Sequence, residues 1–186
     1  MLMNKLTGGG NLPSPAGWYE VVRGFLGGGL GILLVSYLGT LSGVPWIIAP
    51  FGATCVLLFA APSSPLAQPR NVVLGHLVSA ASGLVLINLF GNSPAIMAIS
   101  VGVAIALMQM LRVTHAPAGA DPIVIFISGI YNWDFLLAPV LVGSITLVLV
   151  ALIINNIRAV ERYPVYWVGK CPSKESGNIK GNVLDR

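Results

Sequence analysis

The sequence predicts an all-α integral membrane protein of about six membrane elements, arranged as a 3+3 inverted repeat whose second and fifth elements are broken. Hydrophobic residues make up 55% of the 186 positions and charged residues 9%, whereas a soluble domain carries about 25% charged residues. A second observation is an Ala-Pro-x-Gly-Ala pattern, which begins at Ala49 and again at Ala116. The third is the placement of basic residues at the ends of alternate apolar stretches.

The apolar stretches divide the chain into three parts. We expect residues 1–17 to be a flexible N-terminal segment, 18–157 to be the transmembrane domain, and 158–186 to be a polar cytoplasmic tail. Within the domain, the first repeat covers about 18–90 and the second about 94–157. The glycine- and proline-rich residues 1–17 contain one lysine, which is not typical of a cleavable signal or a transit peptide.

Four of the predicted elements are plain transmembrane helices, because each is a long apolar run. Their expected ranges are 18–40, 71–90, 95–113 and 135–157. The first contains two GxxxG spacings, Gly24/Gly28 and Gly27/Gly31, which let two helix backbones approach closely. From the face formed by Gly24, Gly28 and Gly31 we expect a homo-oligomer.

The second element, at about 44–61, cannot be one plain helix. Pro45 and Pro50 remove backbone donors and Gly52 weakens a helix, so we expect an extended lead-in as far as Ala53. Thr54 then caps a short helix. About ten extended residues at about 3.3 Å and about eight helical ones at about 1.5 Å would together cross a ~30 Å hydrocarbon core.

The fifth element, at about 114–131, repeats this design. Asp121 stands at the cap position that Thr54 occupies in the first copy, and Pro122 follows at a position where proline starts helices well. Two Pro/Gly-interrupted segments at matching places in two halves indicate the binding site of a transporter. The simpler alternative is that proline and glycine merely kink two packed helices.

The basic residues predict the orientation. Six crossings place Lys5, Arg23, Arg70, Arg112 and every basic residue of the tail on one side, while the opposite connections carry none. Both termini are therefore expected in the cytoplasm, which for a bacterial protein means insertion in the inner membrane. Three crossings per half turn the two copies upside down relative to each other, so the short helices enter from opposite faces.

A helix N-terminus carries partial positive charge and unpaired N–H groups, so two converging starts form an anion site. Small residues would leave the backbone amides within reach. The predicted binding residues are Gly52, Ala53 and Thr54 in the first copy and Gly119, Ala120 and Asp121 in the second. The Asp121 carboxylate opposes a simple anion site; it is either a proton carrier or only a cap.

His76 and His115 are the two histidines, and both are added to the candidate site because imidazole titrates near neutrality. His76 is equally well explained as a hydrogen-bonded packing residue. No metal-ligand spacing, nucleotide fingerprint or nucleophile motif is present, so we expect no cofactor, no metal and no enzyme activity. The scattered basic residues do not indicate nucleic-acid binding, and the expected partners are a small inorganic anion and the lipid bilayer.

At these residues the chain resembles the HPP family of small integral membrane proteins. The longer matching stretch runs from Pro50 to His76, P-F-G-A-T-C-V-L-L-F-A-A-P-S-S-P-L-A-Q-P-R-N-V-V-L-G-H. The shorter is His115 to Ala120, where Ala116 replaces the middle residue of the His-Pro-Pro tripeptide that names the family. The resemblance covers about 18–157 and implies a transporter; some cyanobacterial and plastid members carry nitrite. The family is usually described with four or five spans rather than six.

The sequence therefore predicts transport of a small monovalent anion, nitrite first. Two alternatives stay open. One is a carrier of a neutral or protonated solute that uses Asp121 and His115 for proton coupling. The other is a membrane scaffold without transport activity, which binds partners through the glycine face of the first span.

Overall fold

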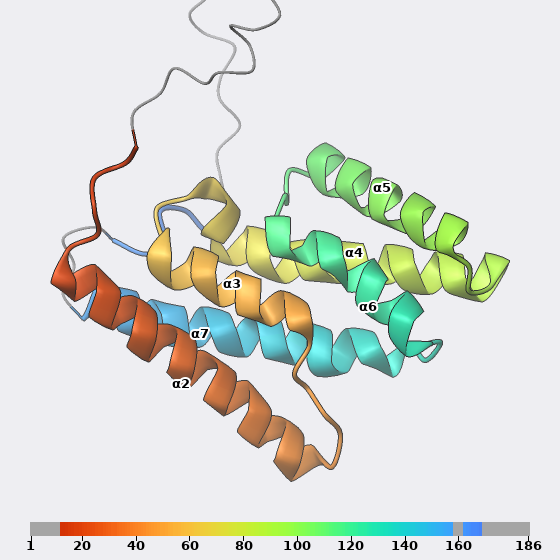
Figure 1. The fold of residues 1–186 in the computed structure, drawn as a ribbon, viewed down its shortest axis with the longest axis horizontal. Coiled ribbons are helices and arrows are strands. Elements are labelled where there is room, and N and C mark those ends of the chain that lie inside the picture. The colour runs from red at the N-terminus through yellow and green to blue at the C-terminus, as the bar shows by residue number, and fades with distance from the viewer. Residues whose placement is uncertain (1–11, 158–161, 169–186) are drawn as a thin grey trace, which may run out of the picture.

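The computed structural model describes residues 12–157 and 162–168 (Figure 1). Over these ranges the chain is helical and has no strand, which confirms the predicted all-α class. The elements are α2 (Trp18–Ser42), α3 (Ala49–Ala60), η1 (Pro65–Ala67), α4 (Pro69–Phe90), α5 (Pro94–Met110), η2 (Ala116–Ala120), α6 (Asp121–Ser128), η3 (Leu136–Leu141) and α7 (Val142–Asn156). Most of the predicted N-terminal segment and of the tail lies outside the described residues.

Three of these helical stretches are long and apolar enough to cross a membrane: Trp18–Ser42, Pro69–Phe90 and Leu136–Asn156. The remaining apolar stretches, Ala49–Ala60, Pro94–Met110 and Ala116–Ser128, are shorter. All four helices expected from the sequence are present close to their predicted bounds, and three of them are long enough to span a membrane; Pro94–Met110 is shorter. The last of them is not straight, because Ala138 leaves helical backbone angles just before Pro139.

The second element departs from the prediction at its start. Helix α3 begins at Ala49, and only the residues before it are extended. Pro50 lies in the first helical turn, where no intrahelical donor is needed, so it starts the helix instead of delaying it. Thr54 is consequently inside α3 and does not cap it; its hydroxyl lies 3.1 Å from the carbonyl oxygen of Pro50, one turn earlier.

The fifth element is interrupted, in a different way from α3. The Ala116–Ala120 segment forms a 3₁₀ turn, and α6 starts afresh at Asp121. Pro122 has no N–H to donate to the carbonyl four residues earlier, so the tight turn cannot continue into one regular α-helix. The Asp121 side chain makes no capping hydrogen bond, which corrects its expected role as a cap.

Helix α4 runs through the middle of the bundle and contacts α5, α6, η2 and α7. Helix α2 lies obliquely across α3 and α7, as Figure 1 shows. Gly31 of the predicted interface packs inside the chain, because a side chain there would lie 3.0 Å from Leu147 Cδ2. Gly27, its partner in the GxxxG spacing, does so as well, because a side chain there would overlap the ring of Phe59. Gly24 faces open space.

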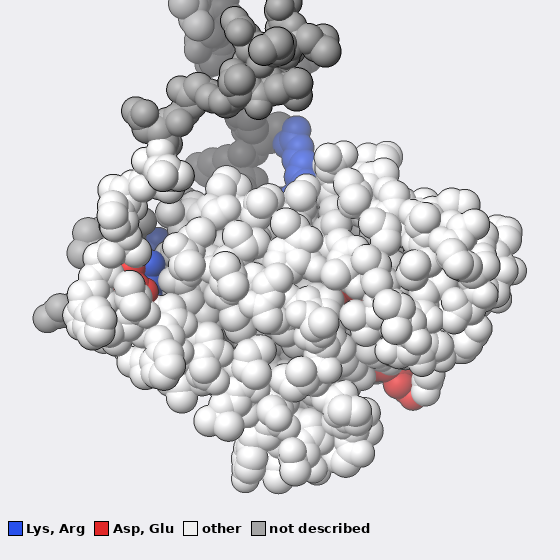
Figure 2. Space-filling view, in the orientation of Figure 1, with Lys and Arg blue, Asp and Glu red and all other residues white. Residues whose placement is uncertain are grey.

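The surface in Figure 2 consists almost entirely of uncharged residues. Arg23 at the start of α2 bonds to the carbonyl of Phe59 near the end of α3, and Arg70 at the start of α4 bonds to the carbonyl of Leu111 just after α5. These contacts bring Arg23, Arg70 and Arg112 to one end of the bundle, called the basic end below. The turns after α2 and α6 lie at the opposite end.

Candidate functional site

Four of the predicted site residues meet in the interior of the bundle. Thr54 comes from α3, His76 from α4, His115 from the residue before η2, and Asp121 from the start of α6; all four are fully buried. Their side chains form one continuous chain of hydrogen-bonding groups, called the buried polar network below. It joins segments that lie far apart in the sequence.

The network runs from Asp121 to the carbonyl of Leu66. His76 Nδ1 lies 2.8 Å from Asp121 Oδ2, and His76 Nε2 lies 2.9 Å from Thr54 Oγ1. His115 Nε2 lies 3.0 Å from the same hydroxyl, while His115 Nδ1 lies 2.7 Å from the Leu66 carbonyl oxygen in η1. A single hydroxyl therefore separates two imidazoles, whose ring centroids are 4.9 Å apart.

Helix α4 holds the second copy of the motif in place. Asn71 donates to the carbonyl of Thr114 at 2.9 Å, and Ser79, two turns on, donates to the carbonyl of Ala118. Between them Gly75 leaves room for the His115 backbone, because an added Cβ would lie 2.6 Å from the Cβ of His115. Close approach of backbone to a neighbouring element is a position that only glycine fills without rearrangement.

The hydrogen-bond partners restrict where the protons of the network lie. A carbonyl oxygen only accepts, so His115 Nδ1 carries a hydrogen and donates to Leu66. If Asp121 were ionised and both imidazoles neutral, His76 would donate through Nδ1 and both Nε2 atoms would lack a hydrogen. Thr54 has one hydrogen for two such acceptors, so a lone pair would face a lone pair at about 3 Å.

One added proton removes this conflict. Shared by Asp121 and His76, it allows His76 Nε2 to donate to Thr54 and Thr54 to donate to His115. A second added proton is also accommodated: both Nε2 atoms then donate to the Thr54 oxygen, and its hydroxyl turns to the carbonyl of Pro50, 3.1 Å away. The network thus has two well-bonded forms that differ by one proton.

Asp121 has a further unused acceptor. Its Oδ1 atom is buried and has no hydrogen-bond partner, while Oδ2 bonds to His76. A buried unpaired acceptor is costly and calls for an explanation. Among the described titratable groups, His76 interacts electrostatically with both Asp121 and His115. The neighbouring Cys55 thiol lies 3.6 Å from the Cβ position of Gly31, on the α2 side of α3.

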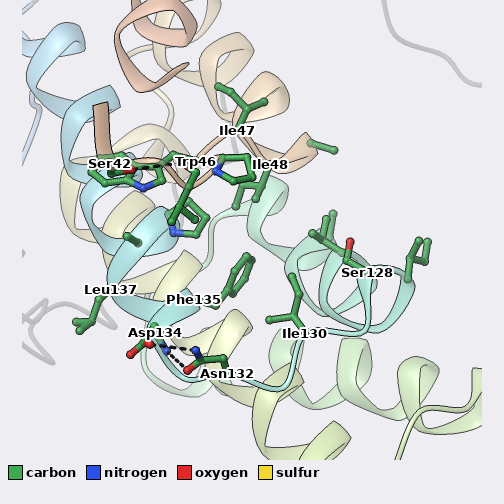
Figure 3. A pocket seen from close by; sticks show the side chains of 18 of the residues that line it. Ser42, Trp46, Ile47, Ile48, Ser128, Ile130, Asn132, Asp134, Phe135 and Leu137 are labelled. Carbon is green, nitrogen blue, oxygen red and sulfur yellow. Dashed lines mark hydrogen bonds between the residues drawn. The ribbon is translucent and has the colours of Figure 1, made fainter. Parts of the chain in front are cut away.

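A cavity of about 1040 Å³ lies between the extended lead-in to α3, helix α6 and the start of η3 (Figure 3). Most of its walls are apolar, and the polar side chains of Ser42, Ser128, Asn132 and Asp134 stand among them. Ala49, the first residue of α3, and Ala120, which directly precedes α6, both line it. The cavity therefore extends from the end opposite the basic end to the starts of both short helices, next to the buried polar network.

The remaining predicted residues are less central. Gly119 is half-buried and does not line the cavity, whereas Ala120 does. Gly52 and Ala53 are exposed on the outer face of α3, where Gly52 borders a groove shared with Gly24 and Gly28. Sequence reasoning missed Ala49 and the Leu66 carbonyl; the helix start at Pro50 would have indicated the first, and nothing in the sequence marks the second.

The sequence matches the HPP transmembrane region over residues 13–164. The chain belongs to the HPP family. A transmembrane protein of Dictyostelium discoideum is 36% identical over 174 residues, covering 88% of this chain and 56% of that protein. A second Dictyostelium transmembrane protein is 36% identical over 128 residues, covering 65% of this chain and 45% of its own length.

The chain thus spans about half the length of these curated relatives, and no solved structure matches it significantly. Family membership and the apolar helices together make this an integral membrane protein. The HPP signature stretch predicted from the sequence carries Thr54 and His76, two of the four side chains of the buried polar network.

Proposed function

We propose that this HPP protein transports a small monovalent anion across the membrane, with nitrite as the first substrate to test. The observation that carries the proposal is the cavity, which ends at Ala49 and Ala120, the starts of two short helices. A helix start carries partial positive charge, so it attracts an anion. At these two starts Pro50 and Pro122 have no N–H, and the N–H groups of Phe51 and Asp121 bond to the carbonyls of Ile48 and Ala118, so the attraction would come from the helix dipoles and the remaining N–H groups. No buried lysine or arginine is required for such a site.

Several contacts support the inverted repeat on which this site depends. If α2, α3 and α4 correspond to α5, α6 and α7, the α2–α7 contact corresponds to the α5–α4 contact, and both pairs pack together. Thr54 and Asp121 occupy the same position of the repeated motif and bond to opposite nitrogens of His76. The two aligned side chains therefore meet at one residue of α4.

The finer sequence predictions belong to the same proposal: six crossings, both termini in the cytoplasm, a bacterial inner membrane, and a homo-oligomer. Reporter fusions at Asn92 and at residue 186 test the orientation, because they should fall on opposite sides of the membrane. A fusion at 186 that reports from outside the cytoplasm would remove the argument for an inverted repeat.

A second candidate is a carrier of a neutral or protonated solute. It is favoured by the Asp121 carboxylate at the start of α6, which competes with a bound anion for the same partial charge. A scaffold without transport activity is the third reading. Purified protein in proteoliposomes separates them: saturable nitrite entry supports the first, and no flux of nitrite, nitrate, formate or chloride contradicts it.

The repeated motif provides a matched pair of variants. Ala120 lines the cavity, whereas Ala53, its counterpart in the first copy, is exposed on the outside of α3. Ala120→Leu should narrow the cavity beside α6 and reduce flux by tenfold or more, with Ala53→Leu close to wild type. Equal loss in both variants, at equal protein recovery, would contradict a path through this cavity.

A further inference from the structure

The buried polar network stands beside the cavity, and its protons can be counted from its contacts. We propose that the network loads one proton for each anion that enters, so that transport is electroneutral proton–anion symport. This inference rests on the proposed function and assigns its coupling ion and stoichiometry. Thr54, His76, His115 and Asp121 are the residues that hold the proton.

The Thr54 hydroxyl has three neighbours within hydrogen-bond distance. These are the Nε2 atoms of His76 and His115, at 2.9 and 3.0 Å, and the carbonyl oxygen of Pro50, at 3.1 Å. With the hydroxyl turned to His115, the network is fully bonded in its one-proton form. With the hydroxyl turned to Pro50, it is fully bonded with a second proton. Rotation of one hydroxyl therefore lets the network take up a proton without losing contacts between its members.

Charge ties this second proton to the anion. In the one-proton form the network has no net charge, because the added proton that Asp121 and His76 share cancels the negative charge of the Asp121 carboxylate. In the two-proton form it carries one positive charge in the interior of a membrane protein, where an unpaired charge is costly. A monovalent anion at the starts of α3 and α6 would neutralise it, and the network would neutralise the anion. Neither the second proton nor the anion is then favoured in the interior without the other, so one proton enters with each anion.

The two ends of the network give the proton different surroundings. Asp121 directly follows the cavity-lining Ala120, so this is the end of the network nearer the cavity, and its buried Oδ1 atom has no hydrogen-bond partner among the described residues. His115 bonds to Leu66, in the η1 turn that follows α3 toward the basic end. In the proposed cycle, water on the cavity side gives a proton to the Asp121–His76 pair, the proton passes through the Thr54 hydroxyl to His115, and His115 releases a proton to water at the basic end. Only N–H and O–H bonds form and break.

Asp134 is a further charged group that lines the cavity, where it bonds to Asn132 and not to the network. Arg70, at the start of α4, bonds to the Leu111 carbonyl. Cys55 on α3 lies against α2, and Tyr163 bonds to the Ala67 carbonyl at the basic end. The elements packed around the network therefore contribute to it only the four side chains named above.

The test measures proton and nitrite entry together in proteoliposomes, with an internal pH dye for protons and a colorimetric assay for nitrite. Protein-free liposomes provide the correction for nitrous acid that crosses lipid unaided. We expect about one proton per nitrite, and a nitrite accumulation that does not respond to a potassium–valinomycin potential. A uniporter would instead shift its accumulation ratio by about 50-fold per 100 mV, from about 2.3 kcal/mol per charge.

Two variants at Thr54 test the network itself. Thr54→Val keeps the volume but removes the hydroxyl, so proton uptake should fall by tenfold or more, whereas Thr54→Ser should restore it. Nitrite entry that carries current without acidification would overturn the inference and leave the proposed function standing. Acidification without nitrite would overturn it as well, and no entry of any of the four anions would overturn both. The wild-type ratio decides the question even if Thr54→Val does not fold.

Discussion

The two copies of the Ala-Pro-x-Gly-Ala motif begin alike and end differently. Each follows an extended residue, Ile48 in the first copy and His115 in the second. From there the first copy continues as one 12-residue helix, while the second makes a five-residue 3₁₀ turn and restarts as an eight-residue helix. The same pentapeptide thus supports both a continuous and an interrupted helix.

The residue one position after the aligned Thr54 and Asp121 accounts for the difference. It is Cys55 in α3, whose N–H can take part in the helix, and Pro122 in the second copy, which has no N–H. The pentapeptide therefore determines where the helical segment begins, whereas Cys55 or Pro122, two positions after the pentapeptide, determines whether the helix is continuous. Both arrangements bring the aligned side chains to His76.

The largest expected effect comes from removing the link between the copies. His76→Ala leaves both Asp121 and Thr54 without their shared partner in a fully buried site, which should cost about 3–5 kcal/mol of stability. Thermal unfolding in mild detergent measures it. Ser100→Ala is the control, because Ser100 is also buried in a helix and its hydroxyl has no partner; a loss equal to that of His76→Ala would contradict the bridging role.

The second prediction concerns a variant in which the first copy of the motif is followed by proline, as the second copy is. Cys55→Pro removes a helical N–H from the interior of α3 and should destabilise the protein by about 3 kcal/mol or more. Cys55→Ala keeps the N–H and should lose much less. Comparison of the two unfolding temperatures separates the backbone effect from the loss of the thiol, and equal losses would show that the proline position does not decide the helix type.

The variants at His76 and Cys55 concern two features that the sequence predicted to different degrees. Long apolar runs predicted α2, α4 and α5 closely, because those helices depend on local composition, whereas the kink at Ala138 and Pro139 before α7 was not predicted. The start of α3 was misplaced because Pro50 was taken as a helix breaker, although in a first turn proline is a helix starter. The meeting of Thr54, His76, His115 and Asp121 depends on how four segments pack, which local patterns do not encode.

The third prediction concerns the close contact that holds the second copy against α4. Gly75→Ala would place a Cβ 2.6 Å from the Cβ of His115 and 3.0 Å from the Val113 carbonyl oxygen, so His115 must shift away from Thr54. We expect a cost of about 1–3 kcal/mol and reduced transport. Gly52→Ala in the first copy is the control, since its Cβ would meet nothing within 4 Å. Similar behaviour of the two variants would contradict this packing.

The smallest effect is expected where the loop after α3 is fastened at the basic end. The Tyr163 hydroxyl donates to the Ala67 carbonyl at 2.9 Å, and Val165 N–H donates to Gln68 at 2.8 Å, so residues 162–168 hold the turn that carries Leu66. The turn after α6 has local bonds between Asn132 and Asp134 and one bond from Asn88 of α4 to the Tyr131 carbonyl. Tyr163→Phe should therefore lower the free energy of unfolding by about 1 kcal/mol. The loss should arise at the turn that contains Leu66 and not at the turn after α6.

The pH dependence of this loss provides its check. Burial raises the pKa of Tyr163 above its ordinary value of 10.0, so the folded protein keeps the phenol proton at a pH where the unfolded chain releases it. The contribution of Tyr163 is complete below pH 10 and falls as the pH rises further. The unfolding temperatures of wild type and Tyr163→Phe should thus differ at pH 8 and converge above pH 10. A gap that stays constant or widens would mean that the hydroxyl does not hold the loop through this bond.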